Sequence, residues 1–223
     1  MDNVSEMRIY PLPPVLPGNP YLDLLYDAMA ELSGLTVRRV RPVWRGWLEA
    51  ARTHGRRILH LHFFDELCQR PSRLETRLRT GLFQCVVRVL QWRGIRLVWT
   101  VHNIAPHEPH HPDLADQLYQ WLFINADAVI AHSAGAAAEI RRRYETRSPI
   151  HVIPHGNYIG VYGPEVAQPR AREALGYGSE SFLFASVGTL RRYKGLEILI
   201  EAYRSLSHPE TRLLIAGSAK SPA

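Results

Sequence analysis

Short apolar runs alternate with amphipathic stretches along most of this chain, and that alternation limits the folds open to it. The runs at residues 57–64, 95–103 and 127–133 have the length and apolar content of buried strands. Between them, apolar residues recur at helical spacing. Strands that alternate with helices of about 10–15 residues build right-handed β-α-β units around a parallel sheet. The sequence therefore predicts an α/β fold with a Rossmann-like parallel sheet.

The expected elements fall into two groups, separated by a turn-rich stretch. Residues 156–171 contain three glycines and two prolines, a composition typical of a linker. We therefore place an N-terminal domain at residues 1–163 and a second domain at residues 164–223. In the first domain we expect strands at 7–12, 36–42, 57–64, 95–103, 127–133 and 149–156, and helices at 20–34, 44–55, 113–126 and 134–145, with a long basic helix ending at Gly94. In the second we expect a helix at 170–177, a strand at 181–188, a helix at 195–206 and a strand at 211–217. These are too few elements for a Rossmann-like domain, so we expect the second domain to be incomplete.

Polar residues follow several of the expected strands directly. His102 and Asn103 end the strand at 95–103, Ser133 ends the next, and His155 with Gly156 ends the last of the first domain. Parallel sheets bind ligands at the carboxyl ends of their strands. The sequence therefore predicts that chemistry occurs near His102, although a purely structural histidine is also consistent with this position.

The stretch after His102 contains a literal H-E-x-x-H pattern, in His107, Glu108 and His111. This pattern binds zinc when a helix places both histidines on one face. Pro109 lies inside the would-be helical turn, where proline costs about 3 kcal/mol. We therefore expect a loop here, and no metal site.

The net charge of +6 arises mainly in one segment. Between Arg70 and Arg96 the chain carries seven arginines against a single glutamate. If this segment is helical, Arg73, Arg77 and Arg88 share a face with Arg70, while Leu74, Leu78, Leu82, Val86, Val89 and Leu90 form a broad apolar arc. A basic amphipathic helix can lie on an anionic membrane surface, but an ordinary surface helix fits equally well. Nucleic acid is not an expected partner, because no recognised binding signature accompanies the charge.

Two further features indicate a cytoplasmic location. The chain has no apolar run of about 18 residues, and MDNVSEMRIY lacks the apolar core of a signal peptide. Cys68 and Cys85 lack metal-binding spacing and fit a reduced environment. We expect a cytoplasmic protein, peripheral on the inner face of the plasma membrane.

The turn from Gly188 to Gly195, GTLRRYKG, precedes an expected helix. A helix amino terminus offers backbone N–H groups and a positive dipole to an anion. Arg191 and Lys194 add cationic donors that suit phosphate oxygens. The turn has neither P-loop nor G-x-G-x-x-G spacing. It predicts an anion site, with an exposed basic turn as the alternative.

The order of these motifs resembles the GT-B nucleotide-sugar glycosyltransferases, in particular the family 4-like group. The resemblance covers essentially the whole chain and rests on TVHNIAPHE, SVGTLRRYKGLEILIEAY and LLIAG. It implies that the first domain receives the acceptor and the second holds the donor. It also implies that Gly188, Arg191, Lys194 and Gly195 hold the donor diphosphate, and that His102 reaches the transferred sugar. His102, Arg191 and Lys194 are thus the expected catalytic residues, with no cofactor and no metal.

This chain also departs from the family pattern. Thr189 stands where many relatives have an arginine, and Gly18 alone represents a glycine pair that usually follows the first strand. The family's two glutamates, spaced eight apart, are expected beyond residue 223. The acceptor or cleft candidates on the first domain are Gly18, Asn19, Asn103, Ser133, His155 and Gly156.

The resemblance implies transfer of a hexose from a nucleotide diphosphate sugar to a lipid-linked or polysaccharide acceptor, in exopolysaccharide or glycolipid biosynthesis. The alternative is a non-catalytic chain that binds an acceptor or a partner without the donor half-site.

Overall fold

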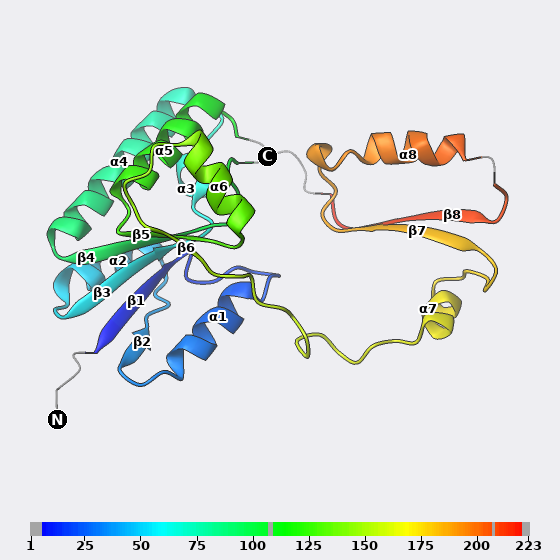
Figure 1. Ribbon diagram of the computed structural model, residues 1–223, viewed down its shortest axis with the longest axis horizontal. Helices are drawn as coiled ribbons and strands as arrows, with labels where there is room; N and C mark the ends of the chain where they lie inside the picture. Colours follow the sequence, from blue (N-terminus) through cyan, green and yellow to red (C-terminus); the bar gives the residue numbers. More distant parts are fainter. Residues whose placement is uncertain (1–5, 107–108, 207, 220–223) are drawn as a thin grey trace. The chain divides into compact units, whose positions relative to one another are not determined.

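The computed structural model describes residues 6–106, 109–206 and 208–219. By its internal contacts the chain forms two compact units, Met1–Asn157 and Tyr158–Ala223. The division falls at the start of the turn-rich stretch, so residue 163 lies within the second unit. The first unit contains a six-stranded sheet, and the second contains a two-stranded sheet (Figure 1).

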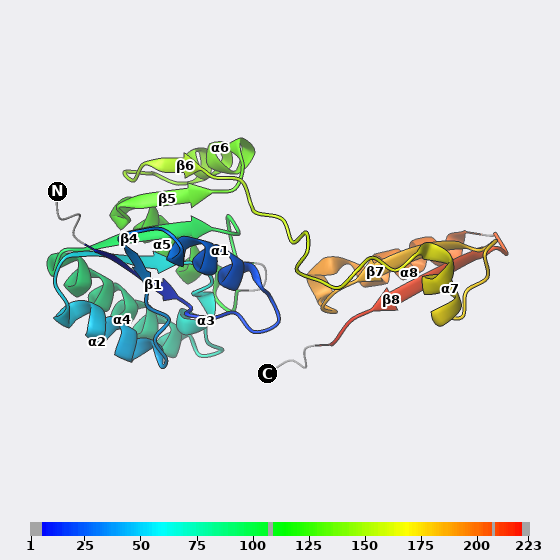
Figure 2. The same ribbon diagram turned by 90° about the horizontal axis from the view of Figure 1, so that it is seen from below.

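All strands of the six-stranded sheet run parallel, in the order β2-β1-β3-β4-β5-β6. Figure 2 shows them side by side, from β6 through β5 and β4 to β1. The strands are β1 (Met7–Leu12), β2 (Leu35–Val37), β3 (Arg56–Leu61), β4 (Ile95–Val101), β5 (Ala128–Ala131) and β6 (Ile150–Val152). From β1 the chain goes outward to β2 and then back across to β3. This reversal is a topological switch point, where open parallel sheets bind their ligands.

The helices cover the sheet unequally. Helix α1 (Tyr21–Ala30) lies on one face, while α4 (Arg73–Trp92) and α5 (Pro112–Asn125) lie on the other (Figure 1). The remaining helices of this unit are α2 (Val43–Arg52), α3 (Asp65–Cys68) and α6 (Ala134–Arg143). The predicted Rossmann-like α/β fold is confirmed.

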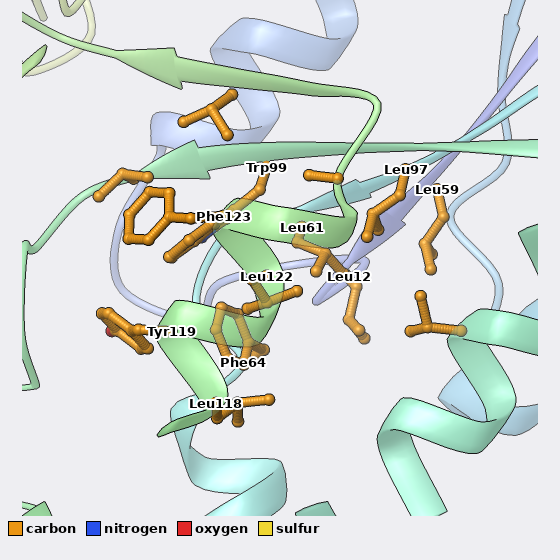
Figure 3. Close-up of a cluster of buried hydrophobic side chains, with 14 of the residues drawn as sticks. Leu12, Leu59, Leu61, Phe64, Leu97, Trp99, Leu118, Tyr119, Leu122 and Phe123 are labelled. Atoms are coloured by element: carbon orange, nitrogen blue, oxygen red, sulfur yellow. The ribbon is translucent and has the colours of Figure 1, made fainter. Parts of the chain in front are cut away.

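Side chains alternate between the two faces along the central strands, as the pleat of a strand requires. Leu59 and Leu61 of β3 are buried in the core under α4 and α5 (Figure 3). Their neighbours His60 and His62 are also buried, but both are hydrogen-bonded to Tyr26 of α1. The sheet thus has an apolar face and a face lined by polar aromatic side chains.

The apolar face is packed around Trp99, which is 1% exposed. Its ring lies 4.6 Å from that of Phe123 and 5.1 Å from that of Tyr119, both on α5. Figure 3 shows these rings beside Phe64 and the leucines of β3, β4 and α5. Removal of such a buried side chain typically costs 3–5 kcal/mol, so this cluster holds the sheet and its helices together.

Several strands are shorter than the sequence predicted; the one expected at 149–156, for example, is β6, Ile150–Val152. The strand expected at 36–42 ends at Val37, and beyond it the Arg39 guanidinium pairs with Asp23 at 2.7 Å and Asp27 at 2.8 Å on α1. The strand expected at 57–64 ends at Leu61, where its pairing with β4 also ends. The unpredicted short helix α3 then begins at Asp65.

The second unit is small and open. Its parallel strands β7 (Phe182–Val187) and β8 (Thr211–Ala216) pair in full register, and its helices are α7 (Gln168–Ala174), the 3-10 turn η1 (Arg192–Lys194) and α8 (Leu196–Ser205). Among the described residues, every buried hydrophobic side chain lies between Ile9 and Tyr144, in the first unit. Phe182, Val187 and Ile198 are 62%, 75% and 73% exposed. The second unit therefore lacks a core of its own within these residues.

Candidate functional site

A cluster of aromatic nitrogen and hydroxyl groups lies at the carboxyl ends of β3, β4, β5 and β6. We define this histidine cluster as His60, His62, His102, His132 and His155, together with Tyr21 and Tyr26 of α1. Its members come from segments far apart in sequence, between Tyr21 and His155, but the histidines occupy neighbouring strand ends, on the face that α1 covers. The predicted gathering of functional side chains at this edge of the sheet therefore includes residues that sequence reasoning did not select.

Hydrogen bonds join the inner members into a chain. The Tyr26 hydroxyl lies 2.9 Å from Nδ1 of His60 and 2.7 Å from Nε2 of His62. Nδ1 of His62 lies 3.1 Å from Nε2 of His102, and Nε2 of His60 lies 2.9 Å from the Thr100 hydroxyl. His102 is thus held from behind by a continuous line of polar groups that ends inside the sheet.

Burial keeps these rings uncharged at neutral pH. It lowers the pKa of His60 to about 4 and, aided by the nearby His132 and His155, lowers the pKa of His102 to about 3. It also lowers the pKa of His62, with His60 and His102 adding to the effect. Each ring therefore carries a single proton at pH 7, on one of its two nitrogens.

The outer part of the cluster surrounds His102 with rings. Phe63 stacks on His102 at a centroid distance of 4.0 Å, and Tyr21 meets it edge-on at 5.0 Å. His132 lies 5.1 Å from His102 and 5.0 Å from His155. Nδ1 of His132 lies 3.0 Å from the Ile153 carbonyl, whereas its Nε2 is buried without a hydrogen-bond partner among the described residues. Such a nitrogen is available to an incoming polar group.

The other cleft candidates lie near this cluster in sequence but mostly serve the backbone. The Ser133 hydroxyl accepts a hydrogen bond from the Ala136 N–H at 3.0 Å and caps α6. Asn19 accepts from the Tyr21 N–H at 2.9 Å and so orients the start of α1.

Two glycines and an asparagine complete the candidates. Gly18 has φ +76°, and no atom lies within 4 Å of the Cβ it lacks, so its backbone is unobstructed on that side. The Gly156 carbonyl accepts from Nδ1 of His155 at 2.6 Å. Asn103 is partly buried immediately after His102.

The H-E-x-x-H segment precedes α5 and does not form a helix in its described part, as expected. His107 and Glu108 lie outside the described residues. His111 precedes the first residue of α5, and its Nε2 lies 3.1 Å from the Pro71 carbonyl. Across residues 6–106, 109–206 and 208–219, no group of three or more His, Cys, Asp or Glu side chains is arranged to hold a metal ion.

The basic turn of the second unit brings its predicted residues together. Gly188 has φ +136°, and a Cβ there would lie 2.8 Å from Nζ of Lys194, so the ammonium group packs directly over this glycine. Gly195, with φ +63°, is the N-cap residue of α8 and has no side chain to satisfy the first N–H groups. Arg191 is partly buried and directly precedes the 3-10 turn in sequence. An ammonium and the open end of a helix thus converge on one short turn.

The basic helix α4 differs from its predicted arrangement. Of the apolar arc, Leu90 is 3% exposed and packs in the core, whereas Leu74, Leu78, Leu82 and Val89 are 67%, 65%, 65% and 55% exposed. Core contacts come from Phe83, Val87 and Leu90, and Val86 packs against the core as well. Helix α4 therefore carries a second apolar stripe on its outer side, which we call the α4 ridge: Leu74, Leu78, Leu82, Val89 and Trp92.

The three membrane-surface candidates on α4 have different environments. Arg73 pairs with both carboxylate oxygens of Asp113, and Arg88 lies over the Trp121 ring at 5.8 Å. Arg77 is exposed beside the α4 ridge. No helix in the described part of the chain is both long enough and apolar enough to span a bilayer.

Sequence reasoning missed His60, His62, His132, Tyr21 and Tyr26. The signal for the first two was available, because both histidines alternate with leucines in RILHLHFF and therefore share one face of a buried strand. His132 directly precedes the selected Ser133, and its ring rather than the serine hydroxyl faces the cluster. The tyrosines are on α1, which only the tertiary fold brings to the strand ends.

Comparisons with known proteins agree with this architecture. A family model described as Glycosyltransferase Family 4 matches residues 35–157, and one described as Glycosyl transferases group 1 matches residues 167–223. GDP-mannose:glycolipid 4-beta-D-mannosyltransferase of Xanthomonas campestris pv. campestris is 28% identical over 212 residues, which are 92% of this chain and 51% of that protein. Alpha-maltose-1-phosphate synthase of Mycolicibacterium smegmatis is 30% identical over 142 residues, 58% of this chain and 36% of that protein.

Among solved structures, HepE of Anabaena in complex with UDP-glucose matches with a TM-score of 0.58 at 16% identity. The match covers 95% of this chain and 60% of that chain, and at this identity it shows the fold alone. The chain spans about half the length of the mannosyltransferase. Since the first family model covers more than half of the 223 residues, the chain belongs to glycosyltransferase family 4, whose members have the GT-B fold.

Proposed function

We propose that this chain acts in the transfer of a hexose from a nucleotide diphosphate sugar to a lipid-linked or polysaccharide acceptor. The observation that carries the proposal is the turn at Gly188–Gly195, within the segment that matches the glycosyl transferases group 1 model. The similar proteins support the choice of substrates, because one is named for GDP-mannose and a glycolipid, and another was solved with UDP-glucose.

The proposed role of the turn is to bind the donor diphosphate. The amino terminus of α8 presents N–H groups beside Nζ of Lys194, and Arg191 can grip two phosphate oxygens at once. As the sugar leaves, negative charge grows on the diphosphate, and preorganised cations stabilise that charge. We propose that these two side chains do so without a metal ion, so a chelator should leave transfer unchanged.

The proposed role of the histidine cluster is to contact the transferred sugar and the acceptor. His102 is held at the carboxyl end of β4 by His62 and Phe63, and the same cluster contains Nε2 of His132, which has no hydrogen-bond partner in the described part of the chain. Neutral imidazoles of this kind form hydrogen bonds to sugar hydroxyl groups, either as donors or as acceptors. The cluster therefore suits a carbohydrate better than a highly charged ligand.

The test is turnover of donor and acceptor by variants of the basic turn. Arg191→Ala and Lys194→Ala should each lower turnover by about 10²–10³, the effect of losing one charge-stabilising donor. Arg204→Ala is the matched control, because it removes an exposed cation from the last turn of the same helix. His102→Ala should also lower turnover, while His111→Ala should have little effect. Unchanged activity after loss of both Arg191 and Lys194 would rule out the assigned donor site.

The 223-residue chain itself should bind GDP or UDP weakly, and more weakly as salt rises. Isothermal titration at two ionic strengths measures this. If the chain binds a glycan or glycolipid acceptor but neither nucleotide, the non-catalytic binding function is the better description. That alternative draws on the absence of a buried core among the described residues of the second unit.

We further propose that the protein works on the cytoplasmic side of an anionic membrane, with the α4 ridge in the lipid headgroup region. The ridge runs the length of α4, opposite its core contacts, and ends at Trp92, which is 82% exposed. Tryptophan favours the membrane interface, and each basic residue near an anionic surface contributes about 1 kcal/mol. Arg77 is the best placed of the three arginines, because Arg73 is already neutralised by Asp113.

Vesicle co-sedimentation tests this surface. The chain should bind phosphatidylglycerol vesicles in low salt and not phosphatidylcholine vesicles, and Leu78→Glu and Arg77→Gln should each weaken binding. Leu32→Glu is the matched control, since Leu32 is 58% exposed but lies after α1. Equal binding by the ridge variants and the control would exclude α4 as the contact.

A further inference from the structure

We propose that Thr100, His60, Tyr26 and His62 are positioning residues that fix the proton of His102 on Nδ1. His102 then offers an N–H donor to an oxygen atom of the ligand. This inference deepens the proposed transferase function, in which that oxygen belongs to the sugar or to the leaving phosphate. It rests on the direction of the hydrogen bonds between these five residues.

The chain of hydrogen bonds has only two consistent directions. Each neutral imidazole has one N–H and one bare nitrogen, and the Tyr26 hydroxyl has one proton for two histidine neighbours. If Tyr26 donates to His60, then His62 donates to Tyr26, and His102 must donate from Nε2 to His62. If Tyr26 donates to His62, then His62 donates from Nδ1 to His102, whose own proton lies on Nδ1.

The Thr100 hydroxyl selects between these directions. Thr100 is 2% exposed, and Nε2 of His60 is the hydrogen-bond partner of its hydroxyl among the described residues. In the first direction His60 donates to Thr100, which leaves the threonine proton buried without an acceptor. In the second direction Thr100 donates to His60, and the proton left without an acceptor among these residues is on Nδ1 of the partly buried His102 rather than on the fully buried threonine. Leaving one buried hydroxyl unpaired disfavours the first direction by about tenfold or more.

The selected direction has a chemical consequence at His102. Its Nε2 accepts the hydrogen bond from His62, and its Nδ1–H has no acceptor among the described residues. Because burial keeps the ring neutral, His102 donates a hydrogen bond without carrying charge. In this form His102 stabilises an oxygen that gains negative charge. In the opposite tautomer, Nδ1 would carry no proton and could only accept a hydrogen bond.

The tautomer can be measured directly by NMR on the 15N-histidine-labelled 223-residue chain at pH 7. Long-range proton–nitrogen correlation distinguishes imidazoles protonated on Nδ1, on Nε2 or on both, and the His102→Gln spectrum identifies the signals of His102. We expect a single pattern for His102, with Nδ1 protonated and Nε2 bare. A His102 ring protonated on Nε2, or on both nitrogens, would overturn the proposal.

Variants test whether the hydrogen bonds from Thr100 to His62 set the tautomer of His102. Thr100→Val removes the hydroxyl donor with little change in shape and should replace the single His102 pattern by a mixture, while Thr100→Ser should restore it. Tyr26→Phe should also give a mixture. Tyr119→Phe is the control for Tyr26→Phe. Tyr119 is similarly buried, but its hydroxyl donates to Asp65, which takes no part in the hydrogen bonds that lead to His102. A His102 pattern that persists in both Thr100→Val and Tyr26→Phe would refute the inference.

These spectra need no substrate. A failure of the proposed His102 tautomer and a failure of the proposed transferase function are therefore separate results. Thr100→Val should also lower kcat with little change in KM, because the N–H of His102 acts on charge that develops during transfer. Rescue of kcat by Thr100→Ser would distinguish positioning of His102 from a general loss of packing.

Discussion

Lowering the pH from 7 to 5 should destabilise the first unit, with about 4 kcal/mol of the loss coming from His60 and His62 and a further part from His102. Burial lowers the pKa of both rings in the folded protein, to about 4 for His60, whereas an unfolded chain takes up these protons near pH 6.5. Below that pH the unfolded state binds more protons, so stability falls as the pH falls. Over the roughly 1.5 pH units between 6.5 and 5, each ring costs about 2 kcal/mol.

The assay is urea unfolding at pH 7, 6 and 5, followed by tryptophan fluorescence. All five tryptophans lie between residues 44 and 121, so the signal reports the first unit alone. Between pH 7 and 5, carboxylates held by ion pairs do not titrate and so do not contribute to the change in stability. For example, the Arg73 guanidinium lowers the pKa of Asp113 to about 2, and that stabilisation is lost only as the pH falls below about 4.

A variant isolates the contribution of one ring. His60→Gln should be less stable than the parent at every pH, but it should lose about 2 kcal/mol less between pH 7 and 5. His54→Gln, which alters an exposed histidine, should keep the full loss. The reasoning fails if His60→Gln shows the same pH dependence as the parent, or if the parent is equally stable at pH 5 and 7.

Three further outcomes follow from the fold. Ser133→Ala should lower the stability of the first unit by about 1 kcal/mol, the usual value of a helix cap, in the same fluorescence assay. Gly217→Ala should disrupt the pairing of β7 with β8, because its Cβ would lie 1.8 Å from the Gly188 carbonyl oxygen; faster amide exchange at 182–187 and 211–216 would report it. In the unmodified chain, amides of residues 181–217 should exchange faster than those of β3 and β4, since the second unit buries little apolar surface. Equal protection in both units would contradict that expectation.

Periodicity and turn chemistry were sufficient to predict most of the fold. The long helix expected to end at Gly94 is α4, which ends at Trp92, and Gly94 follows it with φ +82°. What the sequence did not reveal was which apolar stripe of this helix faces the core. Leu78 and Phe83 fit a helical pattern equally well, and only the position of the sheet selects Phe83.

The candidate site was predicted only in part, because some of its residues follow from local sequence and others depend on the tertiary fold. His102 could be selected because it ends a strand, and strand ends are defined locally. The contact between His62 and Tyr26 joins residues 36 positions apart, and it depends on α1 covering the face to which even-numbered β3 residues point. Long-range contacts of this kind have no counterpart in local spacing.

The alternation of faces along β3 has a consequence for sequence variation among relatives. Leu59 and Leu61 can exchange with other aliphatic residues, because their neighbours require only volume and low polarity. His60 and His62 cannot, because an aliphatic residue would remove the hydrogen-bond partner of Thr100 in the first case and of His102 Nε2 in the second, and one of the two partners of Tyr26 in either. Substitution tolerance in this strand should therefore rise and fall with every second residue. A deletion of one residue within β3 would exchange the two sets and disrupt both the core and the histidine cluster, even though its overall hydrophobicity would hardly change.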